Sequence, residues 1–395
     1  MMNLDRFQLD RTRRGFTLVE LLVCIGIIVI LVSMLLPTLG RARSAANTAY
    51  CLANLRSIGQ AMTMYVSENG GWIPGSGHTT GRHLWKRGTS GSNSTAVLQP
   101  SYNLTNAPRV NEPLDWAGPL ARAMRLDDAS LTGLDAKARL LFYVRAAPFK
   151  CPAYNNVMAF PNTGSGFDTS LGAQPAFSYN TAQSFLMMPL AAFGTTNASQ
   201  GLVGQMCPGN APYWVLPRNY LPKITNVGPT SRKVFMADGS RRSRNFTTSA
   251  FQVTYTLGMN PQDLQTNETM YTDYGPFTGY TRSYGRTSLS VNTTGPTLYD
   301  TRILSMRHGQ MAPRSVGSVM RLNLVFFDGH AENMLDLAAA DPNLWLPTGT
   351  TWTLSDMTNY ADSAYPSGTG VDACYTDVFN KYMKSVTASN PFVAQ

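Results

Sequence analysis

The stretch "RRGFTLVELLVCIGIIVILVSMLLPTLGRARSAAN", residues 13–47, decides how this chain is built. Its apolar run from Leu21 to Leu36 is broken only by small residues, and counted from Phe16 it reaches 21 residues. As a helix, such a run measures about 30 Å, which is long enough to cross a bilayer. Arginines before the run favour a cytoplasmic N-terminus, so we expect the remainder of the chain to be exported.

Glu20 stands at the edge of this apolar run, where a carboxylate costs about 2.5 kcal/mol or more to insert. A cleaved secretory signal explains the basic start and the apolar run, but it gives Glu20 no role. A twin-arginine signal, suggested by "TRRGFTL", leaves Glu20 equally unexplained. A third interpretation makes Glu20 functional, because a buried carboxylate needs a positive partner. The nearest candidate is a new N-terminal amine made by cleavage.

The order "RRGFTLVE" before an apolar run resembles the prepilin signal of type IV pilins and type II secretion pseudopilins. This resemblance implies that a prepilin peptidase cuts after Gly15 and then methylates the new amine of Phe16. It also implies that Glu20 neutralises the N-terminal amine of a neighbouring subunit during assembly. Pro37 matches the position of a helix-kinking proline in that family.

The helix is expected to continue past the membrane, because no proline occurs between Thr38 and Ser67. Apolar residues recur there at spacings of three and four, which marks one helical face: they are Leu52, Leu55, Ile58, Met62 and Tyr65. We predict one helix from Phe16 to Ser67, ended by the glycines and proline of "ENGGWIP" at 68–74. Its apolar face would pack on the rest of the domain, and part of its surface against other subunits.

Beyond residue 75 the chain is loop-rich, and short strand-like runs stand out. They are "YWVLP" (213–217), "KVFMA" (233–237), "FQVTYTL" (251–257) and "RLNLVFF" (321–327). We therefore expect an α+β fold of the pilin type, in which the long helix packs on an antiparallel sheet with long loops. Asp-Gly follows two of these runs, at Asp238-Gly239 and Asp328-Gly329, and predicts tight turns there.

The second Asp-Gly pair extends the resemblance. "CLANLRSIGQAMTMY" (51–65) and "MRHGQ…RLNLVFFDGHAE" are similar to a bacterial pseudopilin-like group with a C-terminal His-spacer-Asp-Gly motif, the prepilin processing-associated domain. Its motif residues would be His308, Asp328, Gly329 and His330. The spacer between His308 and Asp328 has nineteen residues here and is longer than usual, which leaves the role of His308 open.

A metal site is the less favoured interpretation of the same turn. Asp328, His330 and Glu332 offer carboxylate and imidazole ligands, with His308 as a further one, and zinc or calcium accepts such groups. The sequence contains neither an EF-hand spacing nor an HExxH motif. We therefore predict no bound metal and no cofactor.

The resemblance and the composition together divide the chain into five segments. We expect a leader (1–15), a transmembrane and assembly helix (16–37), an amphipathic continuation (38–74), an exported α+β domain (75–335) and a C-terminal extension (336–395).

Four of the five cysteines would be exported, namely Cys51, Cys151, Cys207 and Cys374, whereas Cys24 lies in the apolar run. None is spaced as in a zinc ribbon or a redox CxxC motif. In an oxidising compartment we expect at least one disulfide among the four, with the pairing left open.

Catalysis and nucleic-acid binding find little support in the sequence. It has no nucleophile elbow, no phosphate-binding loop and no GxGxxG after a strand, so we predict that the chain is not an enzyme. Its formal charge of +9 is scattered rather than gathered on a basic helix with stacking aromatics, which argues against nucleic acid.

We expect a pilin or pseudopilin subunit that is anchored in the inner membrane, processed, and assembled into a pilus-like or secretion filament outside it. Its partners would be copies of itself, other pilin-like subunits, the prepilin peptidase, the inner-membrane assembly platform and lipid. One alternative is a membrane-anchored extracytoplasmic binding module that does not polymerise. Another is an exported hydrolase on the same anchor.

Overall fold

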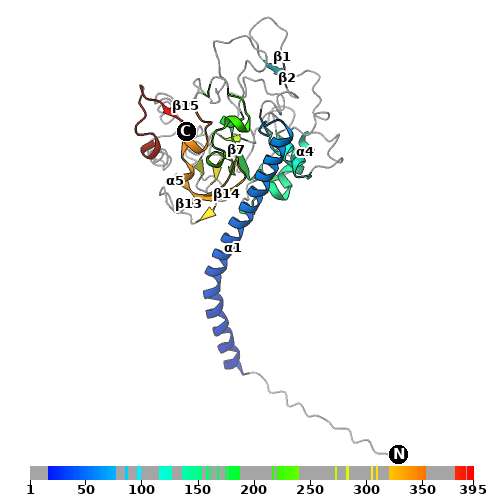
Figure 1. Ribbon diagram of the computed structural model, residues 1–395. Coiled ribbons are helices and arrows are strands. Elements are labelled where there is room, and N and C mark those ends of the chain that lie inside the picture. The colour runs from blue at the N-terminus through cyan, green and yellow to red at the C-terminus, as the bar shows by residue number, and fades with distance from the viewer. Residues whose placement is uncertain are drawn as a thin grey trace, which may run out of the picture. The chain divides into compact units, whose positions relative to one another are not determined.

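One helix dominates the N-terminal part of the computed structural model. This helix, α1 (Leu18–Glu68), has 51 residues and contains Pro37 without interruption (Figure 1). It ends where Gly70 and Gly71 adopt positive φ values of 61° and 85°, and the Gly71 amide donates to the carbonyl of Val66 at 2.9 Å. Glycine suits such helix ends because it lacks the Cβ that disfavours this conformation. The predicted helix and its predicted end are both confirmed.

The structure describes the following residues: 17–76, 85–87, 96–98, 115–126, 136–153, 157–158, 160–161, 167–168, 174–175, 177–186, 216–217, 220–239, 272–273, 282–283, 304–305, 308–309, 320–352, 379–387 and 389–395. The chain divides into two compact units, Met1–Ala46 and Asn47–Gln395. Helix α1 contributes its first part to the first unit and its last part, from Asn47, to the second.

The main sheet of the second unit has the strand order β14-β13-β8-β7-β9, and β12 also pairs with β13. Strands β14, β8 and β12 are antiparallel to β13, and β7 is antiparallel to β8. The bounds are β7 (Tyr179–Ala182), β8 (Val234–Asp238), β9 (Thr272–Asp273), β12 (His308–Gly309), β13 (Met320–Phe326) and β14 (Ala331–Leu335). The predicted antiparallel sheet is confirmed, except that β9 runs parallel to β7.

The pairing register of β13 shows on which side of this strand β12 lies. Leu324 pairs with Ala237 of β8 and with Glu332 of β14, so these two strands flank β13 on opposite sides. Arg321 pairs with Leu335 of β14 and with His308. Strand β12 therefore lies on the same side of β13 as β8, just beyond the end of β8.

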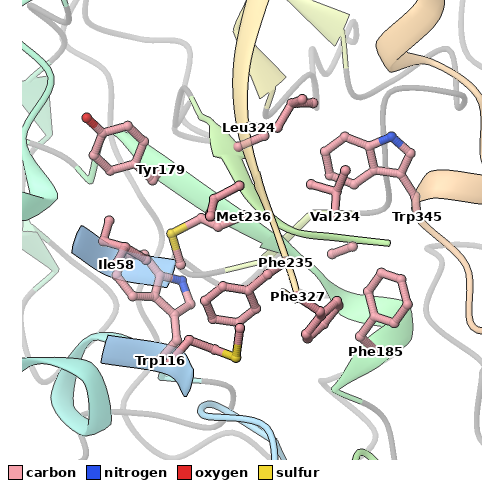
Figure 2. Packing of buried hydrophobic residues seen from close by; sticks show 14 of the residues in the cluster. Ile58, Trp116, Tyr179, Phe185, Val234, Phe235, Met236, Leu324, Phe327 and Trp345 are labelled. Carbon is pink, nitrogen blue, oxygen red and sulfur yellow. The ribbon is translucent and has the colours of Figure 1, made fainter. Parts of the chain in front are cut away.

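The core of the second unit combines the sheet with the last turns of α1 and with aromatic side chains from distant segments. Figure 2 shows Ile58 of α1 and Trp116 near β8, which contributes Phe235 and Met236. Trp116 packs against Phe149 and Phe177, with ring centroids 5.4 Å and 5.1 Å apart. All of these side chains are fully buried. The sheet and helix are thus joined by one apolar cluster.

Shorter elements surround this core. The helices are α3 (Ala117–Ala123), α4 (Ala136–Arg145) and α5 (Asp336–Ala339). Small two-stranded pairs are β1 (Trp85–Arg87) with β2 (Ala96–Leu98), β3 (Val157–Met158) with β6 (Gln174–Pro175), β4 (Phe160–Pro161) with β5 (Phe167–Asp168), β10 (Arg282–Ser283) with β11 (Leu304–Ser305), and β15 (Thr351–Trp352) with β16 (Phe392–Val393).

The strand predictions have different outcomes. "KVFMA" and "RLNLVFF" form β8 and β13, as predicted. The run at 251–257 and most of the run at 213–217 lie outside the described residues, and Leu216 and Pro217 belong to no strand. Residues of the expected C-terminal extension reach the same core, since Trp345, Met383 and Ala394 are buried in it.

Candidate functional site

The first unit presents apolar side chains in every direction. Its large apolar residues from Leu18 to Leu39 are 44–78% exposed, and the described part of this unit comprises Thr17 and the first part of helix α1. Between Leu18 and Leu39 the helix carries one charged side chain, that of Glu20. By length and composition this helix can cross a membrane. No other element of the described unit covers these side chains, so they are available to contact lipid or other chains.

Glu20 closes the start of α1 through a reciprocal pair of hydrogen bonds with Thr17. The Thr17 amide donates to a Glu20 carboxylate oxygen at 2.9 Å, and the Thr17 hydroxyl donates to the same oxygen at 2.8 Å. The Glu20 amide in turn donates to the Thr17 hydroxyl oxygen at 3.3 Å. This capping box satisfies amides that a helix start leaves without partners. Glu20 thus has a local role that the sequence analysis missed, although Thr three residues before Glu is its known signal.

The other expected functional residues of the first unit are placed as follows. Gly15 and Phe16, the expected cleavage and methylation positions, lie outside the described residues. Pro37 lies inside α1, which continues on both sides of it. The hydroxyls of Ser33 and Thr38 donate to carbonyls one turn earlier, at 2.7 Å and 2.8 Å. These bonds remove two polar groups from contact with the apolar surroundings of the helix.

His308 is an almost fully buried histidine of the second unit. It is 2% exposed, and β12 places it opposite Arg321 at the end of β8. Its Nε2 lies 3.3 Å from Oδ2 of Asp238 and 3.9 Å from Sγ of Cys151. Its Nδ1 lies 3.1 Å from the hydroxyl of Thr48 on α1. The residue therefore joins the sheet to the helix through polar contacts on both ring nitrogens.

Asp238, at the end of β8, is positioned as tightly as His308. Its Oδ2 accepts the amide of Asn323 at 2.8 Å, and the residue is fully buried. A buried carboxylate is costly unless it is paired, and the imidazole and the amide meet this requirement. The sequence prediction for Asp238-Gly239 is wrong in its detail. Gly239 extends the ladder with β7 by donating its amide to Ser178 at 2.7 Å.

Gly239 is needed for close packing rather than for a turn. A Cβ atom at this position would lie 2.6 Å from the side chain of Asn180. Two sequences that look alike, Asp238-Gly239 and Asp328-Gly329, therefore have different structures. The buried aspartate of the first pair contacts His308, whereas Asp328 of the second pair is exposed at the surface.

Cys51 of α1 and Cys151 form a disulfide whose Cα atoms are 5.3 Å apart. The predicted presence of a disulfide is confirmed, and its pairing could not be read from the sequence. Cys24 is free and exposed on the first part of α1. Cys207 and Cys374 lie outside the described residues. The bridge ties the helix to the segment that follows α4, across 100 residues of chain.

Asp328 and Gly329 form the turn between β13 and β14, as predicted. Gly329 has a φ of +89°, and its amide donates to the carbonyl of Phe326 at 2.9 Å. His330 bonds Asp328 through its Nδ1 at 2.5 Å and stacks on the ring of Phe326 with centroids 4.0 Å apart. Both polar residues are exposed. The turn therefore has its own side-chain bonds at the surface.

This turn packs directly on α1. A Cβ atom at Gly59 would lie 2.7 Å from the side chain of Val325 and 3.0 Å from the Cα of Gly329. Two glycines thus meet where the helix backbone and the hairpin backbone approach most closely. This contact gives the Asp-Gly part of the motif a packing role between helix and sheet.

The metal ligands proposed from sequence are not brought together as a set. Asp328 contacts His330, but His308 faces the buried Asp238 instead. Glu332 is an exposed residue of β14. Among the residues that the structure describes, possible ligand atoms of Cys51, Cys151 and His308 lie within 4.8 Å of one another, a grouping that the sequence does not reveal.

Lys233, next to β8, carries a buried cationic group. Its Nζ donates to the backbone oxygens of Asn343, Leu346 and Gln395. Burial lowers the pKa of Lys233 from 10.5 to about 8, while Asp341 acts in the opposite direction. The lysine thus fastens two C-terminal segments to the sheet.

Comparisons with known proteins concern the N-terminal part of the chain. Residues 10–36 match the family described as the prokaryotic N-terminal methylation motif. The chain is also 42% identical over 59 residues to the type IV wide pilus major component PilA4 of Thermus thermophilus. The match covers 15% of this chain and 45% of that relative, so the chain spans less than half the length of the relative. No solved structure matches.

Proposed function

We propose that this chain, which is type IV pilin-like, is a structural subunit that assembles through its N-terminal helix into a pilus-like or secretion filament. A prepilin peptidase would cut after Gly15 and methylate the amine of Phe16. The inner-membrane assembly platform, copies of the same chain and other pilin-like subunits would then be its partners. In this proposal, 16–37 is the membrane and assembly segment, and the second unit lies outside the inner membrane.

One observation carries the proposal. The methylation motif at residues 10–36 leads into a helix whose large apolar side chains stay 44–78% exposed. A monomer leaves this surface uncovered by its own described residues, and lipid can cover it only until the subunit leaves the membrane. Packing against the same helix of other copies would cover it again in a filament. The observation therefore fits a segment used first as an anchor and then as an assembly surface.

Processing is tested at the N-terminus. Mass spectrometry of protein from the native host should show a mature chain that begins at Phe16 and carries a methyl group on its amine. Substituting Gly15 with Ala should block this cleavage and leave residues 1–15 attached. An intact Met1, or a start near Ala45, would contradict the proposal.

Glu20 has two roles to separate, the capping box with Thr17 and the proposed charge pairing with a neighbour's Phe16 amine. Glu20→Ala removes both, whereas Glu20→Gln keeps a side chain that suits a capping box and removes only the charge. An unpaired charge buried in the assembly costs about 3 to 5 kcal/mol. We therefore expect both variants to be inserted and cleaved normally but to enter filaments poorly.

The comparison of membrane and sheared-surface fractions distinguishes the two roles. Normal incorporation of Glu20→Gln together with poor incorporation of Glu20→Ala would assign Glu20 to the helix cap alone. Normal incorporation of both variants would remove Glu20 from the assembly mechanism.

A second candidate function follows from the independence of the second unit. Asn47–Gln395 is a compact unit with its own apolar core and a disulfide. Such a unit can act as a membrane-anchored extracytoplasmic binding module without polymerising. Mild shearing separates the two functions, because it releases a filament subunit into the supernatant and leaves an anchored module in the membrane.

A further inference from the structure

A buried cluster of sulfur, imidazole and carboxylate groups lies where α1 meets the sheet, apart from the segment used for assembly. Cys51 and Cys151 are fully buried and His308 is 2% exposed. One sulfur from each cysteine and a ring nitrogen of His308 lie within 4.8 Å of one another. Three elements distant in sequence thus bring soft metal ligands to one point.

We propose that, in the reduced chain, Cys51, Cys151 and His308 form a binding site for a zinc-class metal ion. The disulfide and the metal are then alternative states of the same two sulfurs. This inference goes beyond the proposed function and does not depend on filament assembly.

The orientation of His308 supports metal binding through Nε2. Its Nδ1 lies 3.1 Å from the Thr48 hydroxyl, and its Nε2 faces Cys151. Histidines that bind metals commonly bond a polar group through their other ring nitrogen, which fixes the tautomer and the ring plane. Thr48 lies one turn before Cys51 on α1, so one helical turn supplies both a ligand and the support for another.

The distances around His308 are close to those of a tetrahedral ion, whereas the two sulfurs are bonded to each other and must separate after reduction. Zinc bonds sulfur at about 2.3 Å and nitrogen or oxygen at about 2.0 Å, which places ligand atoms about 3.3 to 3.8 Å apart. The separation between Cys151 Sγ and His308 Nε2 is 3.9 Å, and that between Asp238 Oδ2 and the same nitrogen is 3.3 Å. Asp238 lies beside the ligand nitrogen but outside the group of atoms within 4.8 Å, so it would support the site through His308 rather than as a ligand.

The disulfide form and the metal-bound form interconvert by reduction and oxidation of the two sulfurs. A dithiol or phosphine reductant supplies two electrons, the S–S bond breaks, and two protons from solvent complete the thiols. Binding of Zn²⁺ then replaces the two S–H bonds with Zn–S bonds, adds a bond to Nε2 and releases two protons to solvent. A disulfide-bearing oxidant reverses the sequence by accepting two electrons as the metal leaves. Thiolate and imidazole ligands favour zinc over magnesium or calcium.

The test uses the full chain in detergent, reduced with a phosphine without oxygen, with Co²⁺ as a spectroscopic probe. Cys207 and Cys374 are replaced by Ser in every sample, so that only the cysteines that the structure describes remain. We expect one Co²⁺ per chain with sulfur-to-cobalt charge-transfer absorption, and its displacement by Zn²⁺. The oxidised chain should show no such absorption.

Variants assign the ligands. Cys51→Ser and Cys151→Ser should abolish the absorption, and His308→Gln should weaken cobalt binding by tenfold or more. Asp238→Asn should weaken it less, and Cys24→Ser should leave it unchanged. Circular dichroism checks that each variant is folded. As a second measurement, Zn²⁺ should raise the unfolding temperature of the reduced parent chain but not that of His308→Gln.

The proposal would be overturned by a reduced parent chain that binds no cobalt through sulfur. Binding that is unchanged in folded His308→Gln, or equal in the oxidised chain, would overturn it as well.

Discussion

The two parts of α1 differ in where their apolar side chains find a partner. In the first part Ile28 is 57% exposed, whereas in the second part Ile58 is fully buried against the sheet. The backbone is helical in both, because each sequence favours a helix. The difference lies in what covers the helix. After Asn47 it is the chain's own core, and before Asn47 it would be lipid or another subunit in the proposed function. Pairs of like residues on the two parts allow this comparison to be tested.

The largest expected effect concerns the cysteines. Cys51→Ser removes a disulfide that spans 100 residues, and in the chain-entropy description a loop of this length contributes about 4.7 kcal/mol. Cys24→Ser should change the free energy of unfolding of the second unit by almost nothing, because Cys24 is exposed on the first part. Denaturant unfolding in detergent under non-reducing conditions measures both. Equal stabilities would show that the bridge does not form in solution.

The isoleucines give the next largest effect. Ile58→Ala leaves a cavity in the core and should cost about 2 to 5 kcal/mol of unfolding free energy. Ile28→Ala should leave the unfolding of the monomer unchanged but reduce the amount of subunit in the sheared filament fraction. Thermal unfolding and fractionation report the two outcomes. A stability loss at Ile28 equal to that at Ile58 would mean that the first part already packs within the chain.

Gly59 and Gly26 allow the same comparison between the two parts of α1 for contacts close to the backbone. Gly59→Ala places a methyl group against Val325 and the backbone of Gly329, an overpacking that typically costs about 1 to 3 kcal/mol. At Gly26 no atom lies within 4 Å of an added Cβ, so Gly26→Ala should be tolerated in the monomer. It can even favour the helix by up to about 1 kcal/mol. We therefore expect Gly59→Ala to lower the unfolding temperature and Gly26→Ala to leave it unchanged or raise it.

The smallest expected effect is a pH dependence confined to the second unit. Because the folded-state pKa of Lys233 is lowered to about 8, the unfolded chain holds this proton more tightly. The stability of the unit should therefore rise as pH increases from about 8 towards 10.5, by about 1 kcal/mol once solvent screening is allowed for. Unfolding measured across this interval tests the sign. Lys233→Met should remove the dependence, and a fall in stability in the parent chain would contradict the assignment.

Several of these features follow from sequence because they are local. The apolar run, the three-and-four spacing up to Met62 and the glycines at 70–71 predicted α1 and its end. Short strand-like runs predicted β8 and β13. The contacts of His308 could not be predicted from the sequence. They depend on the pairing of β12 with β13 beside Asp238, and the nineteen-residue spacer gives no local signal for that pairing. The same holds for the Cys51–Cys151 pairing, which depends on where distant segments meet.

The two Asp-Gly pairs follow similar strand sequences, which predicted the same tight turn for both. Asp328-Gly329 is a turn, whereas Asp238-Gly239 ends β8 in extended ladder pairing, although the preceding residues look alike. The packing of Asn180 against Gly239 and the contact of Asp238 with His308 distinguish the two pairs. Glu20 shows the converse case, since its capping box with Thr17 follows from local sequence, a Thr three residues before a Glu at the start of a helix.

The most direct test of the central claim is electron cryomicroscopy of material sheared from the surface of the native host, with the chain identified by mass spectrometry. The account predicts a helical filament in which the first part of α1 forms the core, so that Ile28 is buried between subunits and the second unit lies outside. Shear fractions without the chain, with single copies of the processed subunit retained in the membrane, would contradict it.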